Sequence, residues 1–395
     1  MISTPNSTTL TKPAYRICTR TVMDTSDPNI TFDKDGVCNH YWQYQEQVKK
    51  YVIRGDAGLA RLKETAERIS KIGKGSRYDC ILGLSGGVDS TYLCLLAKQY
   101  GLRPLIVHFD NGWNSELAVN NIENTVKRLQ FDLHTHVCDW EEFRDLQRSY
   151  FKANVVDIEV LTDHGFMAAL YQQARKHRIK FVLAGMNLVT EAILPENWIF
   201  PKGDLTNILN IHRQFGRIPV SKLRSYPMLD PDRRAILDKL LGLEFVTPLN
   251  YVQYNYDQVK RIISDELGWR EYGGKHYESV FTRFYQGYLL PAKFGFDKRR
   301  AHLSTLICSG QMNRDDALAI LERPGYDPEQ YRIDRPFVLK KLGFSEAEFD
   351  RYIQAARVEH KTYGTHLTRF RYLRWLKPAR RLVGRILAGS RQTTT

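Results

Sequence analysis

Short apolar runs alternate with helix-type patterns through the first half of the chain. The runs predict strands at residues 80–84, 105–109, 133–137 and 181–184. Between them, apolar positions recur at helical spacing and predict helices at residues 90–100, 115–129, 141–153 and 163–177. Strands that alternate with helices of this length form a parallel sheet with helical crossovers. We therefore expect an α/β fold, with a doubly wound and mostly parallel sheet, over residues 77–225.

The segments on either side of this domain follow other patterns. Residues 31–38 predict a hairpin with its turn at 33–36, and residues 42–73 predict a helix. Helical patterns dominate after residue 225, and no internal repeat is visible. The chain thus divides into five expected parts: a disordered N-terminus at 1–14, a cysteine-bearing module with a helix at 15–76, the α/β domain at 77–225, a helical substrate or partner domain at 226–345 and a basic helical tail at 346–395.

Each predicted strand ends in polar residues. The clusters are Ser85–Ser90, Asp110–Gly112, Asp139, and Gly185–Asn187 followed by Glu191. In open α/β sheets, ligands bind beyond the carboxyl ends of the strands. We therefore expect one crevice that receives polar side chains from four strand ends.

The first of these clusters has the character of a phosphate-binding loop. The strand at 80–84 runs directly into Ser85-Gly-Gly-Val-Asp-Ser90, and a helical pattern begins at once. Glycines let backbone N–H groups approach oxyanions closely, and a helix start adds unpaired N–H donors. The loop has neither the G-x-x-x-x-G-K-[ST] spacing nor the G-x-G-x-x-G pattern. It resembles the PP-loop of the ATP pyrophosphatase superfamily, which implies cleavage of ATP between the α and β phosphates.

The strand-end clusters supply the predicted ATP-binding residues: Ser85, Gly86, Gly87, Val88, Asp89, Ser90, Asp110, Asn111, Gly185 and Asn187. Asp89 is also the candidate ligand of Mg²⁺, which would offset the charge of the leaving pyrophosphate. Two alternatives stay open. Asp110 fits a helix N-cap, although Asn114 or Ser115 fits that role better, and Gly185 with Asn187 fits a plain turn.

Basic residues that follow the α/β domain are candidates for the chemistry that the loop itself lacks. Lys275, His276 and Lys298 join Asp89 as candidate catalytic residues, because cations at the α-phosphate would stabilise its transition state. Glu191, Glu278 and Arg299 are candidate substrate residues. The alternative for the basic residues is a solvated face, and for His212 we expect a structural role at least as readily as a catalytic one.

The cysteines do not complete a metal site. Cys18 and Cys38 flank the predicted hairpin as zinc-knuckle ligands do, but Thr21 and Tyr41 stand where second cysteines would be needed. His40 adds a third ligand at most. Free thiols are therefore favoured over Zn²⁺ at Cys18 and Cys38.

Composition and charge bear on the compartment of the protein and on the partner of its basic tail. The 395 residues carry a formal net charge of +14, and no apolar run approaches the roughly 20 residues that span a bilayer. The first residues have no apolar core of a secretory signal, and six scattered cysteines suit a reducing compartment, so we expect a cytoplasmic protein. The basic tail, 372–387, fits a solvated terminal helix about as well as it fits a segment that binds either anionic lipid or a protein partner.

Several blocks together resemble the N-acetyl sugar amidotransferase family of bacterial surface-polysaccharide biosynthesis. Besides the loop, they are Cys18–Pro28, Asp35–Asn39, Val107–Trp113, Ile211–Gly216, Gly273–Ser279 and Ser309–Gln311. The most specific block is Gly273-Gly-Lys-His-Tyr-Glu-Ser279. Members commonly carry a CxxC at each end of the N-terminal module, and this chain departs from that pattern at Thr21 and Tyr41.

The resemblance implies an ATP-dependent reaction that forms AMP and pyrophosphate. An acetamido oxygen of a nucleotide-linked N-acetyl sugar is adenylated, and ammonia then replaces AMP to give an acetamidino group. No Cys-His-Glu glutaminase arrangement is evident, so the resemblance implies a separate glutaminase and a cyclase-like, ammonia-channelling subunit, similar to those of imidazole glycerol phosphate synthase.

Two other functions stay open at this point. The first is a PP-loop enzyme that adenylates a base oxygen of tRNA, which would suit the basic charge, although no RNA-binding module or paired sulfur-transfer cysteines are found. The second is a nucleotide-sensing protein with a vestigial loop, against which the intact Ser85–Ser90 sequence argues. No nucleic-acid partner is therefore expected.

Overall fold

A parallel five-stranded sheet forms the centre of the computed structural model, which describes residues 14–274 and 277–369. The strand order is β3-β2-β1-β4-β5, and all four neighbouring pairs are parallel. The strands are β1 (Cys80–Gly83), β2 (Pro104–Asp110), β3 (Asp132–Val137), β4 (Phe181–Leu183) and β5 (Glu244–Val246). The α/β fold class and the first four strands confirm the prediction. β5 was not predicted, so the sheet continues beyond residue 225, where the sequence pattern placed its end.

The sheet separates two apolar cores because successive side chains of a strand point to opposite faces. Ile81 belongs to one core, whereas Cys80 and Leu82 belong to the other. In β2, Val107 and Ile106 divide in the same way. Burial on both faces explains why these strands are continuous apolar runs rather than alternating ones.

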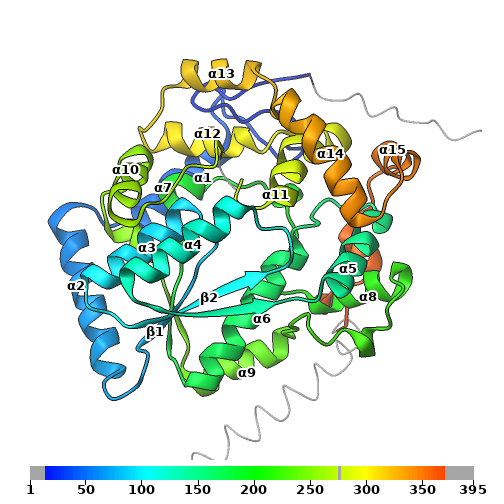
Figure 1. Cartoon of the computed structure of the whole chain (residues 1–395). Coiled ribbons are helices and arrows are strands. Elements are labelled where there is room, and N and C mark those ends of the chain that lie inside the picture. The colour runs from blue at the N-terminus through cyan, green and yellow to red at the C-terminus, as the bar shows by residue number, and fades with distance from the viewer. Residues whose placement is uncertain (1–13, 275–276, 370–395) are drawn as a thin grey trace, which may run out of the picture.

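Helices cover both faces of the sheet (Figure 1). The core that contains Leu82 is covered by α2 (Gly55–Ile72), α3 (Val88–Gln99), α4 (Glu116–Leu129) and α10 (Tyr256–Leu267). The core that contains Ile81 is covered by α5 (Trp140–Ala153), α6 (Val160–His177) and α8 (Leu205–Phe215). The predicted crossover helices are confirmed. Connecting elements are α7 (Leu188–Glu191), η1 (Glu196–Trp198), η2 (Val220–Lys222), α9 (Pro231–Leu241) and η3 (Pro248–Tyr251).

One predicted helix is wrong. The pattern over 42–73 forms two helices, α1 (Asn39–Tyr51) and α2, with an extended break between them. At the break, Ile53 N–H donates to the Asn250 carbonyl at 2.9 Å, and Gly55 has a φ of +63°. A contact from a segment 200 residues away therefore ends a helix that local spacing alone would continue.

A helical region closes over the strand ends (Figure 1). It comprises α11 (Val280–Phe284), the wide-turned π-helical segment η4 (Tyr285–Phe294), α12 (Arg299–Cys308), α13 (Arg314–Glu322), α14 (Pro328–Leu342), α15 (Glu346–Gln354), η5 (His360–Tyr363) and α16 (His366–Arg369). Ser115 N–H donates to the Glu278 carbonyl at 2.9 Å, and Val280 N–H donates to the Trp113 carbonyl at 3.0 Å. These bonds fix the segment after residue 277 against the loop that follows β2.

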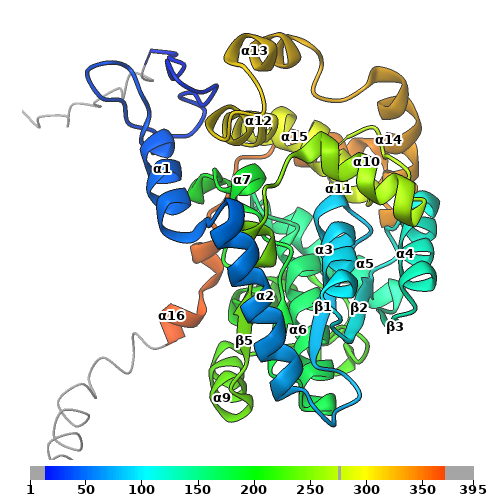
Figure 2. The same ribbon diagram turned by 90° about the vertical axis from the view of Figure 1, so that its left-hand side faces the viewer.

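The N-terminal module lies beside α12 and α13, as Figure 2 shows. Its predicted hairpin is confirmed by an antiparallel bridge between Phe32 and Cys38 and by Gly36, which has a φ of +79° in the turn. Val22 N–H donates to Ser304 Oγ at 3.1 Å and attaches the module to α12. Within 14–274 and 277–369, no helix is both long and apolar enough to cross a membrane.

Candidate active site

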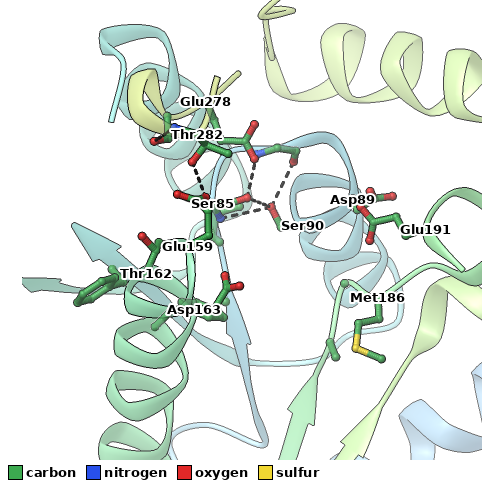
Figure 3. Close-up of a pocket in the computed structure, with 18 of the residues that line it drawn as sticks. Ser85, Asp89, Ser90, Glu159, Thr162, Asp163, Met186, Glu191, Glu278 and Thr282 are labelled. Carbon is green, nitrogen blue, oxygen red and sulfur yellow. Dashed lines mark hydrogen bonds between the residues drawn. The ribbon is translucent and has the colours of Figure 1, made fainter. Parts of the chain in front are cut away.

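The Ser85–Ser90 loop has the geometry of an anion seat. Gly86 has a φ of +87°, which L-residues with side chains rarely adopt. Ser85 Oγ accepts a hydrogen bond from Gly87 N–H at 3.2 Å, and Ser90 Oγ donates to the Gly87 carbonyl at 3.2 Å (Figure 3). Gly87 is the N-cap of α3 and offers no side chain to its first N–H groups. Those donors, with the positive end of the helix dipole, remain available for a ligand.

The loop opens into a cavity of about 870 Å³. The cavity lies where the connections from β1 lead to β2 on one side and, after β3, return to β4 on the other. Residues 83–85 and 87–90 line it from β1 and α3, and residues 182–186 line it from β4. This is the topological switch point at which doubly wound sheets bind ligands, and its volume is in the range of small-molecule sites, roughly 300–1,000 Å³.

Two aromatic side chains that also line the cavity hold the loop through a backbone carbonyl. Trp269 Nε1 and Tyr272 OH each donate to the Gly86 carbonyl at 2.8 Å. Both follow α10, more than 180 residues after the loop in sequence. These positioning residues were missed by sequence reasoning, since an aromatic pair before Gly273-Gly274 carries no specific signal.

Asp89 lies on the α3 side of the cavity, facing Glu191 in Figure 3. Its Oδ1 accepts a hydrogen bond from Tyr254 OH at 2.5 Å and one from Asn187 Nδ2 at 3.4 Å. Burial, followed by the charge of Asp89, raises the pKa of Tyr254 well above its ordinary value, so the tyrosine stays protonated and donates. Asn187 also caps α7 through Oδ1, which accepts from Val189 N–H at 3.0 Å. It therefore serves both the turn and the carboxylate.

The predicted residues after β2 separate in space. Asn111 lines the cavity and donates to Thr162 Oγ1 at 3.0 Å. The Asp110 carboxylate does not line the cavity that the described residues form: its Oδ1 accepts from Gly112 N–H at 2.9 Å and from Asn114 Nδ2 at 3.2 Å. Ser115 is the N-cap of α4. The structure thus gives Asp110 a role in shaping the β2 loop and does not bring it to the ligand space.

The opposite wall carries charged residues that the sequence did not single out. Glu159 Oε2 accepts a hydrogen bond from Thr282 Oγ1 at 2.8 Å, while Oε1 is buried and has no hydrogen-bond partner among the described residues. Burial, followed by the charge of Asp163, raises the pKa of Glu159 to about 7. Lys202 bridges Asp157 at 2.7 Å and Asp163 at 3.0 Å. In the sequence, the only sign of these residues was that Asp157 and Glu159 interrupt the apolar run 155–161.

The predicted basic cluster divides between site and scaffold. Lys298 lines the cavity, and burial lowers its pKa. Glu278 and Glu191 also line the cavity, and Gly185 lies beside Ser90 there. Lys275 and His276 lie outside the described residues.

The structure places Arg299, a predicted substrate residue, outside the cavity lining. Its guanidinium pairs with Asp297 at 2.7 Å and donates to carbonyls in the last turn of α13 and just after it, at residues 320, 323 and 324. Arg300 is equally committed, because it pairs with Asp24 at 2.9 Å. Both arginines tie segments together and do not line the cavity.

The two knuckle cysteines lie side by side without the remainder of a zinc site. Cys18 Sγ accepts from Cys38 N–H at 3.2 Å and from Arg20 N–H at 3.4 Å, and Thr21 Oγ1 lies 3.6 Å from Cys38 Sγ. The hydrogen bond between the two thiols lowers the pKa of Cys18 and raises that of Cys38. Among the described residues, no three His, Cys, Asp or Glu side chains are grouped as metal ligands. The thiol pair and its hydroxyl neighbour do not fit Zn²⁺.

His212 has a structural environment. It is 1% exposed, and its Nε2 lies 2.7 Å from the Ile218 carbonyl while its Nδ1 lies 3.2 Å from Ser149 Oγ. It joins α8 to α5 and does not line the cavity. The structural alternative for His212 therefore agrees with the geometry.

Sequence comparisons find partial matches to known proteins. Residues 278–377 match the family described as "LPS biosynthesis protein WbpG-like, C-terminal domain". An uncharacterized protein of Methanocaldococcus jannaschii is 41% identical over 73 residues, which are 18% of this chain and 26% of that protein. The chain therefore matches about a quarter of the length of this curated relative.

Solved structures with partial likeness have low identity. A predicted subunit of tRNA methyltransferase from M. jannaschii is 16% identical, with 47% of this chain and 75% of that chain covered and a TM-score of 0.27. The NH₃-dependent NAD synthetase of Campylobacter jejuni is 16% identical, with 46% and 93% covered and a TM-score of 0.28. The NMN synthetase of Francisella tularensis is 15% identical, with 52% and 95% covered and a TM-score of 0.27.

Proposed function

We propose that the chain is an ATP-dependent amidotransferase that converts the N-acetyl group of a nucleotide-linked sugar into an acetamidino group and releases AMP and pyrophosphate. The observation that carries the proposal is the Ser85–Ser90 anion seat, which opens at the sheet's switch point into a cavity with a second, charged wall. One wall suits the phosphates of a nucleotide, and the other leaves room and polar groups for an acceptor.

In the first step, the acetamido oxygen attacks the α-phosphorus of ATP. An oxygen–phosphorus bond forms, the bond to the β-phosphate oxygen breaks, and pyrophosphate leaves. The backbone N–H groups at the start of α3 would hold the anionic oxygens throughout. Lys298 would add positive charge from the far wall.

Mg²⁺ fits the donor chemistry on the Asp89 side, because it prefers carboxylate and phosphate oxygens, and Asp89 and Glu191 both face the cavity there. When bound with ATP, it would neutralise charge on the departing pyrophosphate. Asp89 itself is kept in position by Tyr254 and Asn187.

In the second step, ammonia attacks the carbon of the adenylated amide, and AMP leaves. Adenylation is needed because an amide oxygen is a poor leaving group and a phosphate ester oxygen is a good one. We propose that a separate glutaminase supplies the ammonia and that a cyclase-like subunit delivers it. A closed path would keep ammonia unprotonated until it reaches the cavity.

The polysaccharide context is proposed from the match at residues 278–377 to a family of LPS biosynthesis proteins. The matched part contributes Glu278, Thr282 and Lys298 to the cavity. A substrate of surface-polysaccharide synthesis would therefore meet residues of the matched region directly.

The test uses the purified full chain with ATP, Mg²⁺, ammonium chloride and a panel of UDP-linked N-acetylhexosamines. We expect AMP and pyrophosphate in equal amounts, dependent on the sugar, together with an acetamidino product by mass spectrometry. Formation of ADP would contradict the proposal. Turnover only in the presence of tRNA would favour base modification instead.

A further inference from the structure

The far wall of the cavity contains two buried polar atoms without a hydrogen-bond partner in the described part of the chain. They are Oε1 of Glu159 and Nε1 of Trp198, and both residues line the cavity. Buried polar groups normally have hydrogen-bond partners. An acceptor and a donor left open on one wall point to a ligand that supplies the missing contacts.

Glu159 is held in place for such a contact. It immediately precedes α6, and its other oxygen is fixed by Thr282 from α11 at 2.8 Å. Thr282 is itself half-buried and lines the cavity. In Figure 3, Glu159 lies on the wall across the cavity from Asp89 and Glu191, with Ser85 between them. A reacting group bound at the loop would thus lie between the two walls.

We propose that Glu159 is the general base of the second step, which accepts a proton from the attacking nitrogen as ammonia adds to the adenylated amide. This role rests on the proposed function. It assigns the far wall to the nitrogen nucleophile and the Asp89 side to the departing pyrophosphate.

The lone pair of ammonia forms a bond to the amide carbon, which gives a tetrahedral adduct with a positively charged –NH₃⁺ group. One proton moves from that nitrogen to Glu159 Oε1. The carbon–oxygen bond to AMP then breaks, AMP leaves with the electron pair, and the product is an amidinium cation. Glu159 returns its proton to solvent after product release.

The surroundings of Glu159 suit a base that works near neutral pH. Burial and Asp163 raise its pKa, while Thr282, Lys202 and Lys298 lower it, and the outcome is about 7. An ideal general base has a pKa near the working pH. The charged groups that shift its pKa are Asp163, Lys202 and Lys298. Asp157 acts on the two lysines, and Glu159 in turn raises the pKa of Tyr285.

The first test is Glu159→Gln in the full chain, with the probes named above. General-base removal should lower kcat with ammonia by roughly 10²-fold or more, while KM for ATP and for the sugar is unchanged. The substitution should lower kcat with hydroxylamine less, because the hydroxylamine adduct is more acidic and loses its proton to water more readily. When rates are compared at a constant concentration of un-ionised ammonia, the rising limb of the wild-type pH–rate profile should disappear in Glu159→Gln.

The matched control is Glu123→Gln, the same chemical change on the exposed surface of α4. It should leave kcat and the pH profile unchanged. Equal losses with ammonia and hydroxylamine, or an increase in KM for the sugar alone, would show that Glu159 binds the acceptor and would overturn its role as a base.

A second test does not depend on activity. A buried carboxyl with a raised pKa binds its proton more tightly in the folded state, so the stability that this proton contributes is present below the ordinary pKa of 4.5 and is lost as pH rises from there to about 7. Glu159→Gln should therefore have a higher urea midpoint than the wild type at pH 8, and this gain should shrink as the pH falls and vanish below pH 4.5. A difference that does not change with pH would overturn the inference.

A failure of the proposed function can be distinguished from a failure of the role of Glu159. If the wild-type chain forms no AMP with any acceptor, the proposed function falls and the role of Glu159 falls with it. If the wild type turns over and Glu159→Gln is normal, only the role of Glu159 is lost.

Discussion

The two walls of the cavity are built in different ways. The loop wall consists of six consecutive residues whose chemistry lies mainly in backbone N–H groups and a helix start. The far wall is assembled from residues 157–163, 202, 282 and 298, which meet only in the folded chain. A short motif therefore specifies the first wall, and tertiary packing specifies the second.

The difference extends to ionisation. Asp89 keeps hydrogen-bond donors close to its carboxylate, whereas Glu159 is buried with one oxygen unpaired in the described part of the chain. Burial disfavours the charged form of a carboxyl, and it raises the pKa of Glu159 to about 7. Two acidic residues facing one cavity thus have different surroundings, which supports the different roles that we propose for them.

The largest effect is expected for substitution of Asp89, on the loop wall. We expect Asp89→Asn to lower the rate of pyrophosphate release by roughly 10²–10³-fold, the range seen when one preorganised electrostatic contact is removed. Asparagine keeps an oxygen that can accept from Tyr254 OH, so the melting temperature should change little. Release of pyrophosphate and thermal unfolding measure the two effects.

Asp257→Asn is the matched control, because Asp257 also lies in the first turn of a helix, α10, but its side chain is 72% exposed. It should leave pyrophosphate release unchanged. Full activity in Asp89→Asn would remove Asp89 from the site and would place the essential charge elsewhere.

The far wall can be tested through Lys298. Loss of this cation in Lys298→Met should raise the pKa of Glu159, because a positive charge that favours its ionised form is gone. Since the base must be ionised, the rising limb of kcat against pH should move to higher pH. The rate should therefore fall severalfold more at about pH 6 than at about pH 8.5.

Lys127→Met on the exposed surface of α4 is the control and should leave the pH profile in place. If Lys298→Met lowers kcat by the same factor at every pH, Lys298 acts on the phosphate alone and is not coupled to Glu159.

Most of the fold could be predicted from the sequence, because its strands and helices have distinct apolar patterns. Strands buried on both faces read as apolar runs, and the crossover helices between them have clear periodicity. β5 was missed because Glu244-Phe-Val246 is three residues long and lies within a helical pattern. The break at residues 52–54 was missed because the hydrogen bond from Ile53 to Asn250 is a long-range contact.

The site could be predicted from the sequence only where the residues that form it are neighbours in the chain. Ser85–Ser90 line or shape the cavity because glycine conformation and a helix start are written into adjacent residues. Arg299 pairs with Asp297 in the folded chain. The sequence alone does not distinguish a basic residue that forms such a structural ion pair from one that binds a substrate. Glu159 was missed because its burial and its unpaired oxygen exist only in the folded chain.

A smaller effect is expected where distant residues support the loop wall. Tyr272→Phe removes one of the two donors to the Gly86 carbonyl and leaves Trp269 Nε1 in place. A typical net hydrogen bond contributes about 0.5–1.5 kcal/mol, which corresponds to a roughly two- to tenfold increase in KM for ATP. Tyr51→Phe on exposed α1 is the control. An unchanged KM would show that the loop holds its conformation through local contacts alone.

The smallest effect is expected at the N-terminal module, where a local motif is present but its chemistry is incomplete. Cys18 and Cys38 hold knuckle-like N–H···S geometry, while Thr21 occupies a place that a third thiolate would need. The module is instead attached by protein contacts, including Arg314, which donates to the Cys18 carbonyl at 3.0 Å. Removing metal with EDTA should therefore leave the melting temperature unchanged, and metal analysis of the purified chain should find no stoichiometric zinc. A lowered melting temperature that added Zn²⁺ restores would mean that Cys18 and Cys38 suffice for a structural metal here, although they lie 20 residues apart in the sequence.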